Sequence, residues 1–406
     1  MRKIISVLLV LILAFAFSSC GKQDTQPLNE PDGTPILTEE EQQEKENAEE
    51  IQNSEDVQTA EAIYSDIDEC TQLPAEAIEV IEEYFAVYYE SIRNLEAQDM
   101  TYLFVKPDGE QAQINQNALE LVCGGRKLKP VDLTLFGGGY HLSFTDCQAS
   151  DSSASVLVLE DSTLKFNCSP DSESVMKNIK NYFTLKKTDD GYKISEYKKV
   201  QDFFVLETLN YSGGGKDELV SLKNKYLGII EDAVSKGGDQ LKDLSYTSEY
   251  NRSKAVEYAN TYYTKKNPDW PYYDGSNCQN FACQCLNAGG IPMDKEGSAT
   301  LYCDGSGVVQ SWTYVPGFRD YVINNSGFGL VGQVDCDLRY AQPGDIVQVG
   351  VNAANRHTTI VTGLVEEDGV VKDVLLNSNT VNMKNFPLSA YVYPCYSLIH
   401  IFGYNE

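Results

Sequence analysis

The sequence has little positive charge. Its 406 residues include 32 lysines and arginines against 60 aspartates and glutamates, which gives a formal net charge of −28 at pH 7. The isoelectric point is accordingly near 4.4. This excess of acidic groups excludes nucleic acid as an ordinary ligand, because nothing in the chain neutralises phosphates. It also disfavours electrostatic docking to anionic envelope polymers.

Histidine is scarce as well, which limits metal chemistry. The three histidines, His141, His357 and His400, lie in unrelated contexts, and none of the 11 cysteines belongs to a Cys-x-x-Cys pair. Structural zinc sites normally need such pairs or Cys/His clusters. We therefore expect no metal site and no cofactor. An exported chain can form disulfides, but the sequence does not reveal which cysteines pair.

Long apolar runs are absent after the first 17 residues. Two basic residues precede an apolar stretch at 4–17 that is too short to span a membrane comfortably. Residues 1–19 are therefore predicted to be a secretory signal. Phe17-Ser18-Ser19-Cys20 resembles a bacterial lipoprotein processing site, where Cys20 would become the lipidated N-terminus; ordinary signal cleavage is the alternative. We expect the mature chain outside the cytoplasm, lipid-anchored to the outer face of the cell membrane or secreted.

Composition divides the rest of the chain. Residues 20–72 are rich in Glu, Gln, Asn, Asp and Pro with few large apolar side chains, which predicts an acidic disordered linker. The remaining length exceeds what one core usually organises, so two domains are expected, at 73–210 and 246–406. Between them, 211–245 should form a connector helix that packs on one domain.

Residues 73–210 combine a helix with later strands. Pro74 opens a segment whose apolar residues keep the helical period, and strand-like runs follow at 156–159, 164–168, 182–185 and 192–194. Asp189-Asp190-Gly191 predicts a hairpin turn between the last two runs. We assign the α+β class, and this domain resembles the cone-shaped NTF2-like fold. A binding or spacing module and a packing partner for the second domain both remain open as its role.

A cysteine stands at the predicted start of a short helix in the second domain. Ser276-Asn277 provides a polar cap before Cys278, and the apolar stripe that follows ends at Gly289-Gly290. Unpaired backbone N–H groups and the helix dipole at such a position favour thiolate over thiol. Cys283 and Cys285 are rival nucleophiles, but they lie deeper in the helix.

A histidine and an asparagine follow the cysteine on predicted strands. His357 heads the apolar run that continues to Val361, and Asn379 follows the run at 374–376. Nucleophile, base and amide orienter in this order predict a Cys-His-Asn triad of Cys278, His357 and Asn379. Asn377 shares a face with Asn379, because side chains alternate along a strand.

The second domain resembles the "putative amidase domain" of secreted proteins from spore-forming, mostly Gram-positive bacteria, which is similar to papain-like cell-wall amidases and peptidases. The resemblance covers about 155 residues and rests on Tyr250-Asn251-Arg252, Ala255, Tyr258-Ala259, Asn267-Pro268, Cys278, Asn280-Phe281, Gln284, Ala288-Gly289-Gly290, Trp312, Gly344-Asp345 and His357. It implies a papain-like fold. Asn277 stands where the family usually has aspartate, and Ser378-Asn379-Thr380 where it commonly has Ser-His-Thr.

The resemblance and the triad together predict a cysteine-dependent amide hydrolase. His357 would take the thiol proton, and Cys278 would attack an amide carbonyl to give a thioester that water resolves. The expected substrate is a peptide or the peptide stem of the cell wall, and the expected state is a monomer. Two alternatives remain: a catalytically silent lipoprotein that binds cell-wall peptide, and an acyltransferase that resolves the thioester with an amine.

Overall fold

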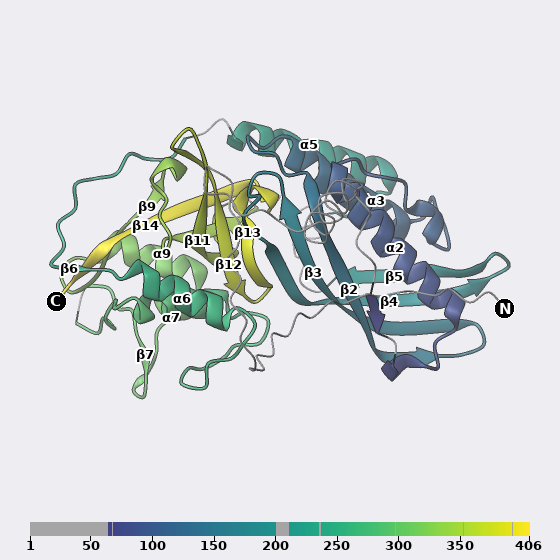
Figure 1. The fold of residues 1–406 in the computed structure, drawn as a ribbon, viewed down its shortest axis with the longest axis horizontal. Coiled ribbons are helices and arrows are strands. Elements are labelled where there is room, and N and C mark those ends of the chain that lie inside the picture. The colour runs from purple at the N-terminus through teal and green to yellow at the C-terminus, as the bar shows by residue number, and fades with distance from the viewer. Residues whose placement is uncertain are drawn as a thin grey trace, which may run out of the picture. The chain divides into compact units, whose positions relative to one another are not determined.

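The computed structural model describes residues 64–66, 68–199, 211–234, 237–296, 298–351, 353–391 and 393–406. The predicted signal at 1–19, the lipidation site Cys20 and most of the linker lie outside this part. The described residues form a mixed structure of helices around one 12-stranded sheet (Figure 1).

The first part of the described chain consists of two helices and four long antiparallel strands. The helices, α2 and α3, pack against the strands (Figure 1). The bounds are α2 Ala75–Asn94, α3 Glu110–Lys127, β2 Leu135–Ala149, β3 Ser153–Phe166, β4 Ser174–Thr188 and β5 Gly191–Lys199, with the short 3-10 helices η1 Asp68–Cys70 and η2 Thr101–Leu103. Helix α2 begins directly after Pro74, as predicted, and buries Ala77, Ile81 and Phe85. The hairpin between β4 and β5 is also confirmed, because Thr188 pairs with Gly191.

Three features of this part differ from the sequence-based prediction. The runs predicted at 156–159 and 164–168 largely belong to one strand, β3. Helix α3 was not predicted, because glutamine and asparagine obscure its apolar period. A short strand, β1 Tyr64–Asp66, pairs parallel with β2, and Cys70 is bonded to β2 by a disulfide. The linker predicted at 20–72 therefore extends too far, because its last residues belong to the folded part.

The connector helix is present as α5 Lys216–Val234. It packs against α3 of the first part, and its buried residues Leu219, Tyr226 and Ile230 lie on one face. The helix expected within 211–245 is thus packed against the first part of the chain.

The second part places helices against the other end of the sheet. Neighbouring strands there run in the order β13-β12-β11-β10-β14, with β9 and β6 paired to β14. The bounds are β6 Ser248–Glu249, α6 Arg252–Tyr262, α7 Cys278–Ala288, β7 Cys303–Asp304, β8 Gly307–Val308, α8 Gln310–Thr313, α9 Val315–Asn324, β9 Gly329–Cys336, η3 Leu338–Tyr340, β10 Ile346–Gly350, β11 His357–Glu367, β12 Val370–Asn379, β13 Asn382–Pro387, η4 Leu388–Ala390 and β14 Cys395–Asn405. Helix α7 packs against α6 and β11.

The sheet continues from the first part into the second. Strand β13 pairs antiparallel with β4, so that Met383 lies opposite Met176. The mixed α and β architecture agrees with the predicted class, while the NTF2-like and papain-like assignments stay predictions. Among the helices in the described ranges, none is long and apolar enough to cross a membrane. The same ranges contain no group of three side chains suited to hold a metal ion.

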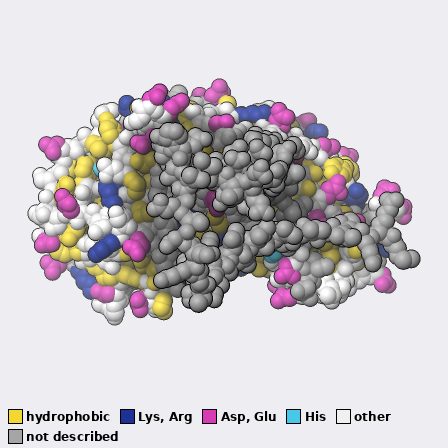
Figure 2. Space-filling model, in the orientation of Figure 1, with side chains coloured by type: hydrophobic (Ala, Val, Ile, Leu, Met, Phe, Trp, Pro, Cys, Tyr) yellow, Lys and Arg dark blue, Asp and Glu magenta, His cyan; other side chains and the backbone are white. Residues whose placement is uncertain are grey.

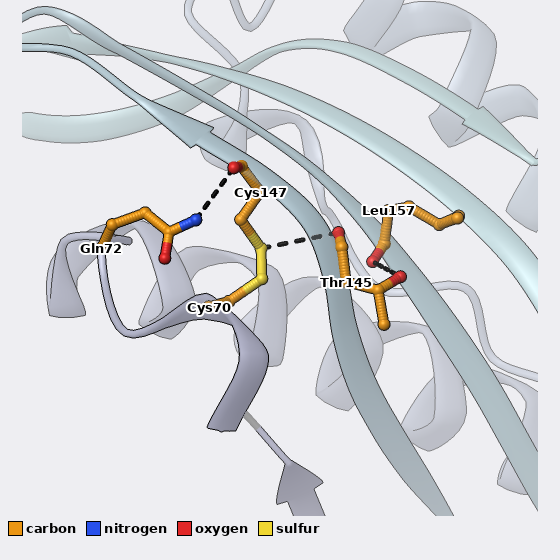
Figure 3. Close-up of a disulfide and its surroundings, with 5 residues drawn as sticks. All are labelled: Cys70, Gln72, Thr145, Cys147 and Leu157. Carbon is orange, nitrogen blue, oxygen red and sulfur yellow. Dashed lines mark hydrogen bonds between the residues drawn. A yellow bond between two sulfur atoms is a disulfide. The ribbon is translucent and has the colours of Figure 1, made fainter.

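One disulfide links η1 to β2. Cys70 and Cys147 are bonded with their Cα atoms 5.6 Å apart, and Gln72 donates a hydrogen bond of 2.9 Å to the Cys147 carbonyl (Figure 3). The cross-link spans 77 residues of sequence, a loop whose closure is worth about 4 kcal/mol in the chain-entropy model.

We predict that Cys147→Ser lowers the free energy of unfolding by about 2–4 kcal/mol, because the unfolded chain regains that freedom. Urea unfolding without reductant measures it. Cys168→Ser, which removes a free cysteine of the same part, is the control and should cost less. Equal stabilities of wild type and Cys147→Ser would contradict the assigned cross-link.

A second prediction concerns Asp373, a carboxylate of β12 with no exposed surface. Burial raises the pKa of Asp373 to about 6, although the N–H groups of Ser389 and Val374 and the charge of Lys129 act in the opposite direction. The folded chain therefore holds this proton more tightly than the unfolded chain, where the pKa is near 3.8. The protonated Asp373 carboxyl therefore makes its full contribution to the free energy of unfolding below pH 3.8, and this contribution is lost as the pH rises through 6.

Between pH 4 and 7 the free energy of unfolding of the wild type should fall by on the order of 3 kcal/mol more than that of Asp373→Asn. Urea midpoints across this range give the measurement. The exposed turn residue Asp368 supplies the matched control Asp368→Asn. Parallel curves for wild type and Asp373→Asn would refute the prediction.

Candidate active site

The predicted helix around Cys278 is present as α7. Cys278 is its first residue, Asn277 occupies the N-cap position, and the helix ends before Gly289-Gly290. Gly290 has φ of +98°, a left-handed conformation that glycine adopts without strain. The side chain of Asn277 makes no capping hydrogen bond, so it is available for other contacts.

The Cys278 thiol is nearly buried, with 7% of the residue exposed. Burial raises the pKa of the thiol above its ordinary value. The backbone N–H groups of Thr358 and Gln279 and the hydroxyl of Thr380 lower it, but burial outweighs them. The N–H groups expected at the helix start are therefore in place, but burial favours the thiol over the thiolate that the sequence predicted.

His357 begins β11 and lies beside the start of α7. The Thr358 hydroxyl donates a hydrogen bond of 2.7 Å to the Gln279 side-chain oxygen, so the residue after His357 is bonded to the residue after Cys278. Burial lowers the pKa of His357 to about 4, which leaves the imidazole neutral at pH 7. Its Nε2 is buried without a hydrogen-bond partner among the described residues. The free nitrogen can accept a proton, but the burial that keeps the ring neutral also makes it a weaker base.

Asn379 lies at the same helix start, but its contacts differ from those of an orienter for His357. Its Oδ1 accepts a hydrogen bond of 2.8 Å from Asn277 Nδ2. Its Nδ2 donates to the carbonyls of Tyr262 and Tyr263, at 2.6 and 3.0 Å. In the described structure no hydrogen bond joins Asn379 to His357. Asn379 and the backbone of His357 thus both lie beside the start of α7, while the Asn379–His357 bond of the predicted triad is replaced by Asn379–Asn277.

A chain of amide side chains continues from this pair. Asn277 Oδ1 accepts from Asn280 Nδ2 at 2.8 Å, and Asn280 Oδ1 accepts from Trp312 Nε1 at 2.9 Å. Trp312 is stacked on Trp270 with ring centroids 5.3 Å apart and is almost fully buried. Trp312 is therefore a core residue that fixes the loop before Cys278. Sequence reasoning matched Asn280 and Trp312 to the family pattern without finding this role.

The remaining candidates near Cys278 are occupied or inert. The Gln279 side chain is buried; its oxygen accepts from Gln348 and Thr358, and its nitrogen donates to the sulfur of Cys283. Burial raises the pKa of Cys283 and of Cys285 well above the usual thiol value. Both are more deeply buried than Cys278, and only at Cys278 do the N–H groups of Thr358 and Gln279 and the Thr380 hydroxyl lower the pKa.

A second buried network explains other residues of the family pattern. Asp345 is fully buried, and its carboxylate contacts Arg252 Nη1 and His400 Nδ1, each at 2.8 Å. It also accepts from the Ile401 N–H at 3.0 Å. These contacts join α6, β10 and β14. His400 is thus a structural partner of Asp345.

Residues 249–401 match the family model described as "Putative amidase domain". This supports the family that the sequence motifs indicated. The uncharacterized protein YhbB of Bacillus subtilis (strain 168) is 28% identical over 188 residues, covering 44% of this chain and 58% of YhbB. The uncharacterized protein YjcM of the same strain is 32% identical over 81 residues, 20% of this chain and 18% of YjcM. The chain thus spans less than two thirds of either relative.

Among solved structures, a "putative aromatic ring hydroxylase" from Novosphingobium aromaticivorans is 14% identical, covering 31% of this chain and 89% of that chain, with a TM-score of 0.22. A protein of unknown function from Mycobacterium tuberculosis is 11% identical and covers 36% and 94% with the same TM-score. Scores at this level support no argument about fold or function. The match that bears on function is therefore that of residues 249–401 to the "Putative amidase domain".

Proposed function

We propose that the chain is a cysteine-dependent amide hydrolase in which Cys278 is the nucleophile and His357 the base. The observation that carries this proposal is the Gln279–Thr358 hydrogen bond, which holds the first turn of α7 beside the head of β11. The match of residues 249–401 to an amidase family supports the same reaction class.

The proposed reaction begins with thiol and neutral imidazole. His357 removes the thiol proton as sulfur attacks the amide carbonyl, and it returns the proton to the leaving amine. The carbonyl oxygen becomes an oxyanion near the start of α7, where the first backbone N–H groups have no partner within the helix. Each such donor is worth about 3 kcal/mol of barrier. Water then hydrolyses the thioester.

We place this reaction outside the cytoplasm, on a peptide or on the peptide stem of the cell wall. The Cys70–Cys147 disulfide supports the location, because disulfides persist in oxidising compartments. Acidic side chains outnumber basic ones on the face shown in Figure 2, which suits a short peptide better than an anionic polymer. We propose a monomer held at the membrane surface by lipid on Cys20.

A silent peptide-binding domain is the second candidate. Two observations favour it: burial raises the pKa of Cys278, and Asn379 contacts Asn277 instead of His357. An acyltransferase would share the same nucleophile and differ only in the acceptor, so added amine distinguishes it from a hydrolase.

We predict that Cys278→Ala abolishes release of products from solubilised cell-wall fragments while the fold stays intact. Mass analysis of the fragments and circular dichroism check the two statements. Cys283→Ala, on the same helix, is the control and should remain active. Product release by Cys278→Ala would end the assignment.

A separate prediction concerns the dependence of activity on pH. Because the pKa of His357 is about 4, the acid limb of the activity profile should lie near pH 4 rather than near 6.5.

A further prediction separates Asn379 from Asn377. Asn379→Ala leaves Asn277 Nδ2 without its partner, and we expect turnover to fall by roughly ten- to a hundredfold as the loop before Cys278 loosens. Asn377→Ala removes contacts with Asn260 and with the Asn385 N–H, so a similar loss of stability should leave turnover nearly unchanged.

Asn379→His should be tolerated, because a histidine ring can accept from Asn277 and donate to a carbonyl. Turnover and urea unfolding of the three variants, measured together, decide the matter. Loss of turnover in Asn377→Ala alone would show that the neighbour has the role given to Asn379.

A further inference from the structure

We propose that the first part of the chain positions the candidate active site, and that Arg126 does so by holding the segment 386–391 that flanks His357. The inference rests on the proposed function for the meaning of the site. It assigns a role to residues outside the 249–401 family match.

Tyr391 connects this segment to the site. Its ring centroid lies 6.3 Å from that of His357. Tyr391 also packs edge-on against Phe386 with centroids 5.2 Å apart. A displacement of Tyr391 would therefore reach His357, the base proposed for Cys278.

The first part of the chain holds this segment at several points. Arg126, near the end of α3, donates from Nε to the Ala390 carbonyl at 3.2 Å, one residue before Tyr391. Phe166 of β3 packs edge-on against Phe386 with centroids 5.8 Å apart. Ser174 of β4 donates to the Asn385 carbonyl at 2.7 Å.

The charged side chain of Arg126 is buried at this contact. The residue is 6% exposed, and its guanidinium lies 5.8 Å from the centre of the Phe166 ring. Burying a charge is costly, and an apolar side chain of similar volume often gives equal stability. A directed hydrogen bond to one carbonyl supplies what an apolar side chain cannot, a fixed position for the backbone at 390. Arg126 is thus a positioning residue that acts through Tyr391.

The second part holds the same segment from its own side. Asp373 accepts a hydrogen bond of 3.0 Å from the Ser389 N–H. The segment is therefore fixed between Asp373 and Arg126, at adjacent residues of η4. Loss of either contact leaves the other in place, so the segment shifts without unfolding.

The test uses the full-length chain and the variant Arg126→Met. Alkylation of Cys278 by iodoacetamide, followed by peptide mass mapping across pH 6–10, reports the thiol and its surroundings without any substrate. We expect the alkylation profile of Arg126→Met to shift, with rates changed by about 2- to 30-fold. Arg126→Lys, which keeps a donor, should recover part of the difference. Lys127→Met, at the exposed neighbouring position, is the matched control and should behave as wild type.

Ser174→Ala provides a second variant should Arg126→Met fold poorly. It removes one hydrogen bond to the Asn385 carbonyl and should shift the profile in the same direction by less; Ser172→Ala is its control. If Arg126→Met and Ser174→Ala are alkylated as wild type at every pH, the inference is overturned. Release of cell-wall fragments is measured in parallel. A shifted profile in chains that release no fragments supports the positioning role and refutes the hydrolase instead.

Discussion

The hydrogen bond between Asn277 and Asn379 is the contact on which the candidate site depends. It joins the residue before Cys278 to the end of β12, and Asn379 is in turn held by two carbonyls at the end of α6. Three elements that are distant in sequence thereby meet at one turn. Because each amide provides both a donor and an acceptor, the pair fixes its own orientation without a charge. The start of α7 can therefore be buried at little electrostatic cost.

The groups that contact the Cys278 thiol are uncharged. Backbone N–H groups and a threonine hydroxyl face Cys278, and the nearby imidazole is uncharged at pH 7. Charged pairs of the second part, such as Asp345 with Arg252, are found in a separate network. In the proposed reaction, charge would form only as the proton passes from the Cys278 sulfur to His357. The barrier then depends on how well the surrounding dipoles are preorganised.

Local pattern was sufficient to predict the elements that carry the candidate residues. A polar cap, an apolar stripe and a glycine pair predicted α7, and the apolar run headed by His357 predicted the strand β11. The contacts of Asn379 were not predictable, because strand alternation shows which face a side chain occupies but not its partner. The role of Arg126 could not be predicted from the sequence either. Its acceptor at Ala390 is 264 residues away, and one arginine in a helix rich in glutamine does not indicate a contact.

The pairing of β13 with β4 also bears on where this chain can be divided. Its family match covers 249–401, which suggests a module that could be excised at that boundary. In the sheet, however, β13 stands between β12 and β4. Excision would turn β13 into an edge strand with unpaired backbone groups, and it would uncover the Phe386 ring that now packs on Phe166. Such edges recruit strands from other molecules. The sequence boundary and the physical boundary of the second part therefore differ, and a fragment cut at the former carries a surface prone to self-association.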